Sequence, residues 1–149
     1  MQSTNESADR VRSHTAPRIN HAIDAETRKR MALVADKDEP EISARIAELS
    51  REWDVERWLE TNASTLAMTG LLLGVTVNKK WLIVPGIVLP FLFQHAVQGW
   101  CPPLPILRRL GIRTREEIDR EKYALKALRG DFDQVSGADA DAAYEASRA

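Results

Sequence analysis

The sequence has little of what disulfide, metal or nucleic-acid sites require. Its 149 residues include one cysteine, Cys101, which excludes an internal disulfide framework and a zinc site of several thiolates. The three histidines, His14, His21 and His95, are scattered and have no metal-ligand spacing. The near balance of 21 basic and 22 acidic residues argues against a surface devoted to nucleic acid. The length is enough for a single domain with one modest core, and we expect no cofactor, no metal and no identifiable small-molecule substrate.

Acidic side chains are absent from the middle of the chain. Residues 61–112 contain no Asp or Glu, although 22 of the 149 residues are acidic. The only charged residues of this window are two lysines and two arginines, namely Lys79, Lys80, Arg108 and Arg109. The segments on both sides carry charges of both signs. This order of polar, apolar and polar segments is typical of a chain that enters a membrane.

Two apolar runs lie within this window, at about residues 61–77 and 81–98. A helix of about 17 residues extends about 25 Å, at the short end of what crosses a hydrocarbon core of about 30 Å. Serine and threonine dilute the first run, so we expect it to insert as a pair with the second. Only residues 78–80 separate the runs, so two helices here must be antiparallel. The sequence predicts an all-α fold, a two-helix antiparallel transmembrane hairpin with amphipathic cytoplasmic helices on both sides.

Basic and aromatic residues mark the outer ends of the two runs. Arginines precede the first run and follow the second, whereas only two lysines lie in the turn. By the positive-inside rule, both termini are predicted to be cytoplasmic. Residues expected at the membrane interface are tryptophans near the predicted boundaries and the arginine pair that would meet anionic lipid, namely Trp58, Trp81, Trp100, Arg108 and Arg109.

The flanking segments are predicted to hold amphipathic helices and unstructured ends. Within residues 18–60, Ile42, Ile46, Leu49 and Trp53 form an apolar stripe at helical spacing. This stripe could lie on the membrane or pair with an earlier stripe formed by Ile19, Ile23 and Met31. Within residues 113–130, a capping box at Thr114 and Glu117 predicts a helix over about 115–129. Residues 1–17 and the acidic tail 131–149 are predicted to be disordered, because they offer little to bury.

A recognisable motif follows the second run, reading Gly-Trp-Cys-Pro-Pro-Leu-Pro-Ile-Leu-Arg-Arg-Leu-Gly-Ile-Arg-Thr. Its main residues are Gly99, Trp100, Cys101, Pro102, Leu110, Gly111 and Thr114. The motif resembles the closing signature of a family of small bacterial membrane hairpins, the transmembrane domain attached to the inner-membrane rhodanese YgaP and found in stand-alone proteins of unknown function. The resemblance covers about 60 residues up to Thr114, and the spacer here is longer and richer in proline. It implies a bacterial inner-membrane location with the lipid bilayer as partner. The chain has no rhodanese domain, so sulfur-transfer activity does not follow.

Several residues of the apolar window are candidates for packing or chemistry. Cys101 is the only thiol and is predicted to lie at the membrane boundary, reachable from the cytoplasm. His95 is expected to form an interhelical hydrogen bond to Ser64 or Thr65. Residues expected to pack or shape the helices are the GxxxG pair and two prolines that should kink the second helix, namely Gly70, Gly74, Pro85 and Pro90. The glycines could serve packing within the chain or self-association.

Three hypotheses for function follow from these patterns. The first is a non-catalytic membrane anchor or assembly subunit, as a homo-oligomer or with a membrane-protein partner. The second is a thiol relay that uses Cys101 in sulfur or redox traffic at the membrane boundary. The third is a soluble all-helical binding module, in which flanking helices would cover the two apolar runs.

Overall fold

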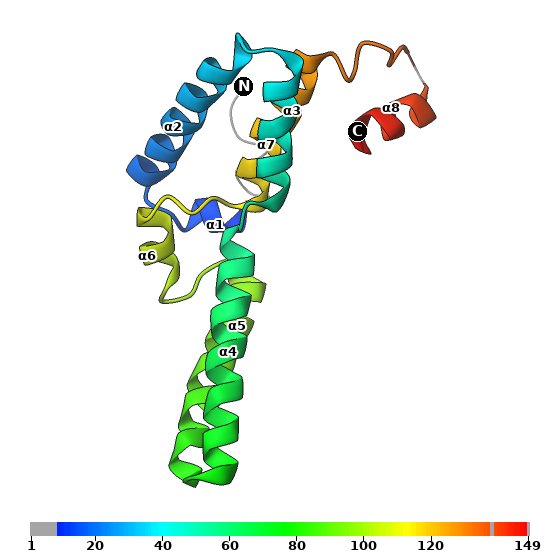
Figure 1. Cartoon of the computed structure of the whole chain (residues 1–149). Coiled ribbons are helices and arrows are strands. Elements are labelled where there is room, and N and C mark those ends of the chain that lie inside the picture. Colours follow the sequence, from blue (N-terminus) through cyan, green and yellow to red (C-terminus); the bar gives the residue numbers. More distant parts are fainter. Residues whose placement is uncertain (1–8, 138, 149) are drawn as a thin grey trace. The chain divides into compact units, whose positions relative to one another are not determined.

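All regular structure in the described part of the chain is helical. The computed structural model describes residues 9–137 and 139–148, and no strand occurs within them (Figure 1). The all-α prediction is therefore confirmed for these residues. The chain divides into two compact units, not into one domain with one core. Unit 1 comprises Met1–His21 and Trp53–Arg115, and unit 2 comprises Ala22–Glu52 and Glu116–Ala149.

Unit 1 contains the apolar window and the segments that hold its two ends together. Its elements are α1 (Arg10–Ser13), the start of α2 (Pro17–Ala35), α4 (Val55–Thr76), the 3-10 helix η1 (Lys79–Leu82), α5 (Ile83–Gln98) and α6 (Leu104–Arg109). Side-chain caps fix several of the starts. Asp54 Oδ1 accepts a hydrogen bond from Arg57 N at 2.8 Å at the start of α4, and Asn78 Oδ1 accepts one from Lys80 N at 2.9 Å at η1.

The helices α4 and α5 lie side by side and run in opposite directions, joined through η1 (Figure 1). We call residues 61–94, at the far part of this pair, the stem, and residues 9–21, 53–60 and 95–115 the head. Pro85 lies in the first turn of α5, where no backbone donor is required. Pro90 alone lies inside the helix, where it removes one hydrogen bond.

Unit 2 is an amphipathic helical cluster with its own core. Its elements are the remainder of α2, then α3 (Glu39–Arg51), α7 (Arg115–Arg129) and α8 (Ala140–Arg148). The stripe on α3 packs against α7, and the core consists of Ile42, Ile46, Leu49, Ile118 and Leu125. The partner of the α3 stripe is thus α7, and neither a membrane surface nor the stripe of α2 takes that place. Trp53 does not continue the stripe, since it belongs to unit 1 and is exposed.

Ion pairs on the α3 and α7 helices support this core. Arg45 donates from Nη2 to Oε1 of the buried Glu121 at 2.8 Å. Arg129 donates to both carboxylate oxygens of Asp131, at 2.7 and 2.6 Å, and to Ser43 Oγ at 2.8 Å. The Arg129 guanidinium lowers the pKa of Asp131, so that this carboxylate stays ionised.

Both ends of the chain contain more helix than their composition suggests. Residues 1–8 of the segment predicted to be disordered lie outside the described residues, but α1 and the start of α2 fall within residues 9–17. In the tail predicted to be disordered, α8 forms with Asp139 as its cap and a hydrogen bond of 2.8 Å from Lys126 Nζ to Ser147 O. Contacts distant in sequence order these segments, and local composition does not report them.

Candidate functional site

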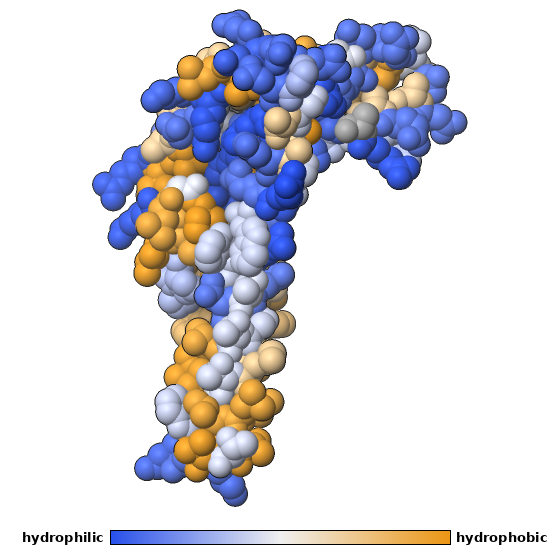
Figure 2. Space-filling view, viewed as in Figure 1, coloured by the Kyte–Doolittle hydropathy of each residue, from blue (hydrophilic) through white to orange (hydrophobic). Residues whose placement is uncertain are grey.

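The stem exposes large apolar side chains to its surroundings. Those on α4, η1 and α5 that are exposed include Leu66, Met68, Leu71, Leu72, Val75, Trp81, Ile83, Ile87, Leu89, Phe91 and Phe93. In Figure 2 the far part of the pair is orange and pale, with blue atoms at the tip, where the two lysines of η1 lie. No polar helix of unit 1 covers these side chains in the described part of the chain.

One stretch among the described residues is long and apolar enough to cross a membrane. It is Lys79–Gln98, and only 6% of its most apolar window is buried. The helix α4 does not meet the same criterion, because Asn62, Ser64 and four threonines lower its hydropathy. Length and composition alone thus single out the second predicted span.

Two glycines bring α4 and α5 into close contact. A Cβ atom on Gly70 would lie 2.6 Å from Pro85 Cδ and 2.8 Å from Val84 Cβ. A Cβ atom on Gly74 would lie 2.5 Å from Leu82 Cδ2. The GxxxG pair therefore faces the second helix of the same chain, and these glycines are not free to pair with another copy.

The head fastens the end of α5 to the N-terminal segment. Gly99 ends the helix with φ +74°, and its amide donates to His95 O at 2.7 Å. Arg10 Nη1 donates to the last carbonyls, Ala96 O and Val97 O, each at 2.9 Å. A Cβ atom on Gly99 would clash with Arg10. The orphan carbonyls at this helix end are thus paired with a cation, which also matches the negative end of the helix dipole.

A set of buried polar residues connects the chain segments that meet in the head. Asp9 caps α1 through Arg12 N at 3.0 Å and accepts from Thr114 Oγ1 at 2.7 Å. Asp54 caps α4 and also pairs with Arg115 Nη2 at 2.6 Å. The sequence prediction missed Asp9, Arg10 and Asp54. Only Asp54 carried a local signal, as an N-cap residue before a helical segment.

Arg108 is not the interfacial residue that the sequence predicts. It is 1% exposed, and its guanidinium donates to Ile112 O and to Asn20 Oδ1, each at 2.9 Å. Its neighbour Arg109 is exposed. The Arg108 guanidinium therefore supplies hydrogen-bond donors inside the head, because buried carbonyl and amide oxygens need a donor there.

The sequence predicts that Cys101 is reachable from the cytoplasm, but the structure buries this side chain. It is 3% exposed and packs in the head core with Val11, Val55, Leu59 and Leu104. Burial raises the pKa of the Cys101 thiol, so the nucleophilic thiolate is disfavoured. Chemistry that depends on a reactive thiolate is correspondingly weakened at this position.

His95 does not form the predicted hydrogen bond to α4. The hydroxyl of Thr65 donates within its own helix, to Thr61 O at 2.7 Å. The His95 side chain is buried, and its Nδ1 has no hydrogen-bond partner in the part of the chain that the structure describes. A buried polar atom left in this state is the exception in folded proteins.

The tryptophans divide between the surface and the interior. Trp58 and Trp81 are exposed, and the Trp58 ring lies edge-on to Trp53 with 5.3 Å between centroids. The Arg57 guanidinium lies 4.5 Å from the Trp53 ring centroid. Trp100 instead packs against the head core. Two of the three predicted anchors therefore have a free face, and the third is structural.

The rest of the motif forms the connection through α6. Gly99 to Pro102 link α5 to this helix, and Leu110 follows it as an exposed residue. Gly111 adopts φ +80°, which turns the chain so that Ile112 packs on the head core. Every motif residue thus has a structural place without a reaction being invoked.

No metal centre is indicated within residues 9–137 and 139–148, where no group of three or more His, Cys, Asp or Glu could hold an ion. Comparison with known proteins adds no further candidate. No family model, no curated protein and no solved structure matches the chain.

Proposed function

We propose that this protein is an integral membrane protein of the bacterial inner membrane, a non-catalytic anchor or assembly subunit. The observation that carries the proposal is the bare apolar surface of the stem. A contiguous apolar surface of this kind is rarely left in water by a soluble domain. Against lipid, the same side chains are favourably solvated, and only the charged head and unit 2 require water.

We propose that α4, the first of the two predicted spans, crosses the membrane together with α5. Three polar side chains of α4 donate to backbone carbonyls of the same helix, namely Asn62 Nδ2 to Trp58 O, Thr65 Oγ1 to Thr61 O and Thr76 Oγ1 to Leu72 O, each at 2.7 Å. Such bonds lower the cost of placing a hydroxyl or amide in lipid. Packing through Gly70 and Gly74 then lets α4 enter together with α5.

We further propose that both termini lie in the cytoplasm, with the η1 turn on the other side. The flanking arginines outnumber the two lysines of the turn, which is the asymmetry that orients short hairpins. Unit 2, with its charged helices, is then available to cytoplasmic or membrane-protein partners.

The other two hypotheses have less support. A thiol relay needs an accessible thiolate, and burial of Cys101 opposes both requirements. A soluble module needs polar helices over the apolar runs, and the stem side chains are exposed. Cys101→Ser should leave function in cells undiminished, whereas a relay would lose it.

Alkaline carbonate extraction of membranes tests the anchor. The full chain should stay in the membrane pellet, and a version in which two stem residues carry charges, Leu72→Lys with Leu89→Lys, should leave it. Arg109→Lys, which changes an exposed residue of the head, should behave as the natural sequence does. Release of the unaltered chain by the carbonate wash would refute the proposal.

Thiol labelling tests the orientation, with exposed reporters in place of the buried cysteine. In a Cys101→Ala background, Lys80→Cys should react with impermeant maleimide in intact spheroplasts. Ser136→Cys should react only in inverted vesicles. The reverse pattern would place both termini outside.

A further inference from the structure

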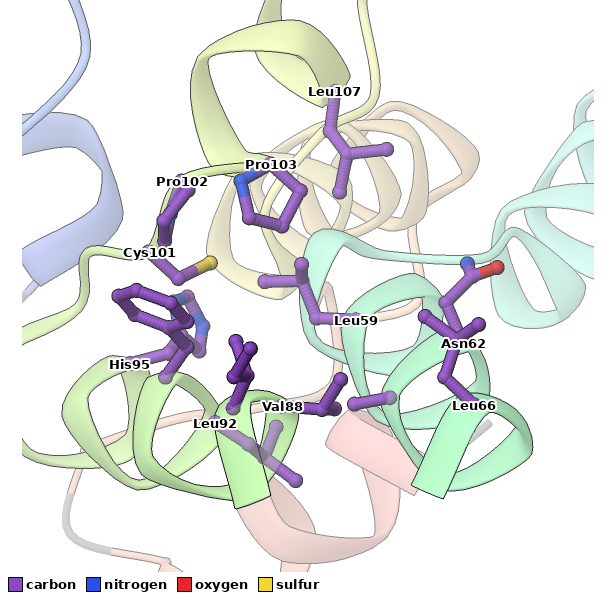
Figure 3. A pocket seen from close by; sticks show the side chains of 13 residues that line it. Leu59, Asn62, Leu66, Val88, Leu92, His95, Cys101, Pro102, Pro103 and Leu107 are labelled. Atoms are coloured by element: carbon purple, nitrogen blue, oxygen red, sulfur yellow. The ribbon is translucent and has the colours of Figure 1, made fainter. Parts of the chain in front are cut away.

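An apolar pocket of about 470 Å³ opens between α4, α5 and α6 in unit 1. Leu59 and Leu66 of α4 line one side, and Val88 and Leu92 of α5 line another (Figure 3). Ala63 of α4 and Ile87 and Phe91 of α5 also line the pocket. Its volume lies within the range of about 300–1,000 Å³ that small-molecule sites occupy. Neither the anchoring role nor the head network requires this space.

The pocket has a polar end at His95, and Asn62 on its α4 side already donates its amide to Trp58 O. His95 and Cys101 lie next to each other on the same side of it in Figure 3. His95 is 8% exposed, and its Nδ1 lacks a hydrogen-bond partner among the described residues. A ligand atom that bonds to Nδ1 would remove the cost of this unpaired group.

The other end of the pocket lies deeper along α5. Ile87 precedes His95 by eight residues, or about 12 Å of helix at about 1.5 Å per residue. Ile87, Phe91 and Leu66 are all exposed as well as lining the pocket, so the cavity opens sideways onto the stem surface. If the stem lies in lipid, the pocket runs from the headgroup level toward the bilayer centre.

We infer that the pocket binds one long-chain fatty acid, an inference that rests on the membrane location proposed above. The hydrocarbon chain lies along Phe91 and Ile87, and the carboxyl group meets His95 Nδ1. A carboxyl group suits either tautomer of the imidazole, because it donates when protonated and accepts when ionised. Among the described residues that line the pocket there is no lysine or arginine to pair with the phosphate of a two-chain phospholipid.

Native mass spectrometry of the purified full chain with oleic acid as the probe tests this inference. The natural chain should retain one equivalent of oleic acid. Ala63→Phe, which fills the pocket, should lower the bound fraction about tenfold. Met68→Phe introduces the same aromatic side chain on the same helix, at an exposed position outside the pocket, and it should bind as the natural chain does.

The single thiol gives a second readout that does not depend on a variant folding. Cys101 is buried but lines the pocket, so N-ethylmaleimide can approach it only through that opening, and oleic acid should slow this already slow reaction about tenfold. Prior reaction with the maleimide should in turn abolish the oleic acid adduct. Equal binding by Ala63→Phe, an unchanged rate at Cys101, or retention of phospholipid in place of oleic acid would each overturn the inference.

Carbonate extraction separates this inference from the anchor. Ala63→Phe should remain in the membrane pellet, since its stem surface is unchanged. If the natural chain stays in the pellet but binds no oleic acid, the fatty-acid site is wrong and the anchor stands. If it leaves with the wash, the anchor itself is wrong.

Discussion

The stem and the head of unit 1 distribute their apolar and charged side chains in opposite ways. In the stem, the smallest residues lie between the helices and the largest apolar ones face outward, as at Gly70 and Phe93. In the head, apolar side chains such as Leu104 are buried, and charged groups such as Arg108 are buried with them. In the proposed membrane setting, the stem would face a solvent without hydrogen bonds, and the head would face water.

This difference changes what each region can tolerate. The pairing of α4 and α5 in the stem depends on close packing at Gly70 and Gly74. In the proposed membrane setting this packing matters more, because lipid tails are as apolar as leucine side chains and give the helices no hydrophobic reason to pair. The head depends on satisfied polar groups, since every donor that is removed leaves a buried acceptor unpaired. Substitutions should therefore act through sterics in the stem and through hydrogen bonds in the head.

The largest effect is expected at the buried cation of the head. Arg108→Ala leaves Ile112 O and Asn20 Oδ1 without their donor and removes the packed side chain, so we expect a loss of about 3 kcal/mol in the free energy of unfolding. Chemical unfolding in micelles, followed by tryptophan fluorescence, measures it. The exposed neighbour provides the control, and Arg109→Ala should stay within about 0.5 kcal/mol. Equal effects at the two positions would remove the distinction between inner and outer arginine.

The next effect belongs to the stem and is steric. Gly70→Ala places a methyl group 2.6 Å from Pro85 Cδ, so α4 and α5 must separate at a cost of about 1–3 kcal/mol. Gly86→Ala is the matched control, because a Cβ atom there meets nothing within 4 Å and Ala favours the helix. The same unfolding measurement compares them. A Gly70→Ala chain as stable as the natural one would show that the pair does not pack as described.

The stem was predictable from the sequence because its signals are local. The carboxylate-free window, residues 61–112, contains it, and the spacing of Gly70 and Gly74 indicates the packing face. The head was not predictable, because its contacts join residues far apart in the chain. Thr114 binds Asp9 across 105 positions, and Arg10 reaches Ala96 across 86. No periodicity reports such pairs, and a basic residue such as Arg108 is expected at a surface until its partners are known.

The pocket between the two regions was equally hidden. The sequence drew attention to His95 and Cys101 separately, as a polar residue in an apolar run and as a single thiol. Their proximity depends on the proline-rich turn that brings the chain back after Gly99, and turn geometry of this kind is not encoded in a hydropathy pattern.

A smaller effect is expected for the hydrogen bond between Thr114 and Asp9. Thr114→Val keeps the shape of the side chain but leaves Asp9 Oδ2 without this donor, for a loss of about 1 kcal/mol. Thr114→Ser retains the hydroxyl and should recover most of it. Hydrogen exchange at α1 amides would reveal the loss as faster opening. If valine and serine behave alike, the contact is not a hydrogen bond that stabilises the head.

The smallest effect is a gain of stability at the edge of the head. Burial is the main cause that raises the pKa of Glu56 above 4.5, with nearby Asp54 and Asp9 adding to it. The folded chain therefore holds this proton more tightly than the unfolded chain, and stability falls as pH rises from about 4.5 through the folded pKa.

Glu56→Gln cannot ionise, so it should be more stable than the natural chain at neutral pH, on the order of 0.5 kcal/mol after allowance for partial exposure. The difference should vanish below about pH 4, where the glutamate is protonated in both states. Glu26→Gln, an exposed change in unit 2, should show no such pH-dependent gain. Unfolding curves at several pH values decide the matter, and a gain that persisted into acid would mean that shape, and not charge, limits the stability of this part of the head.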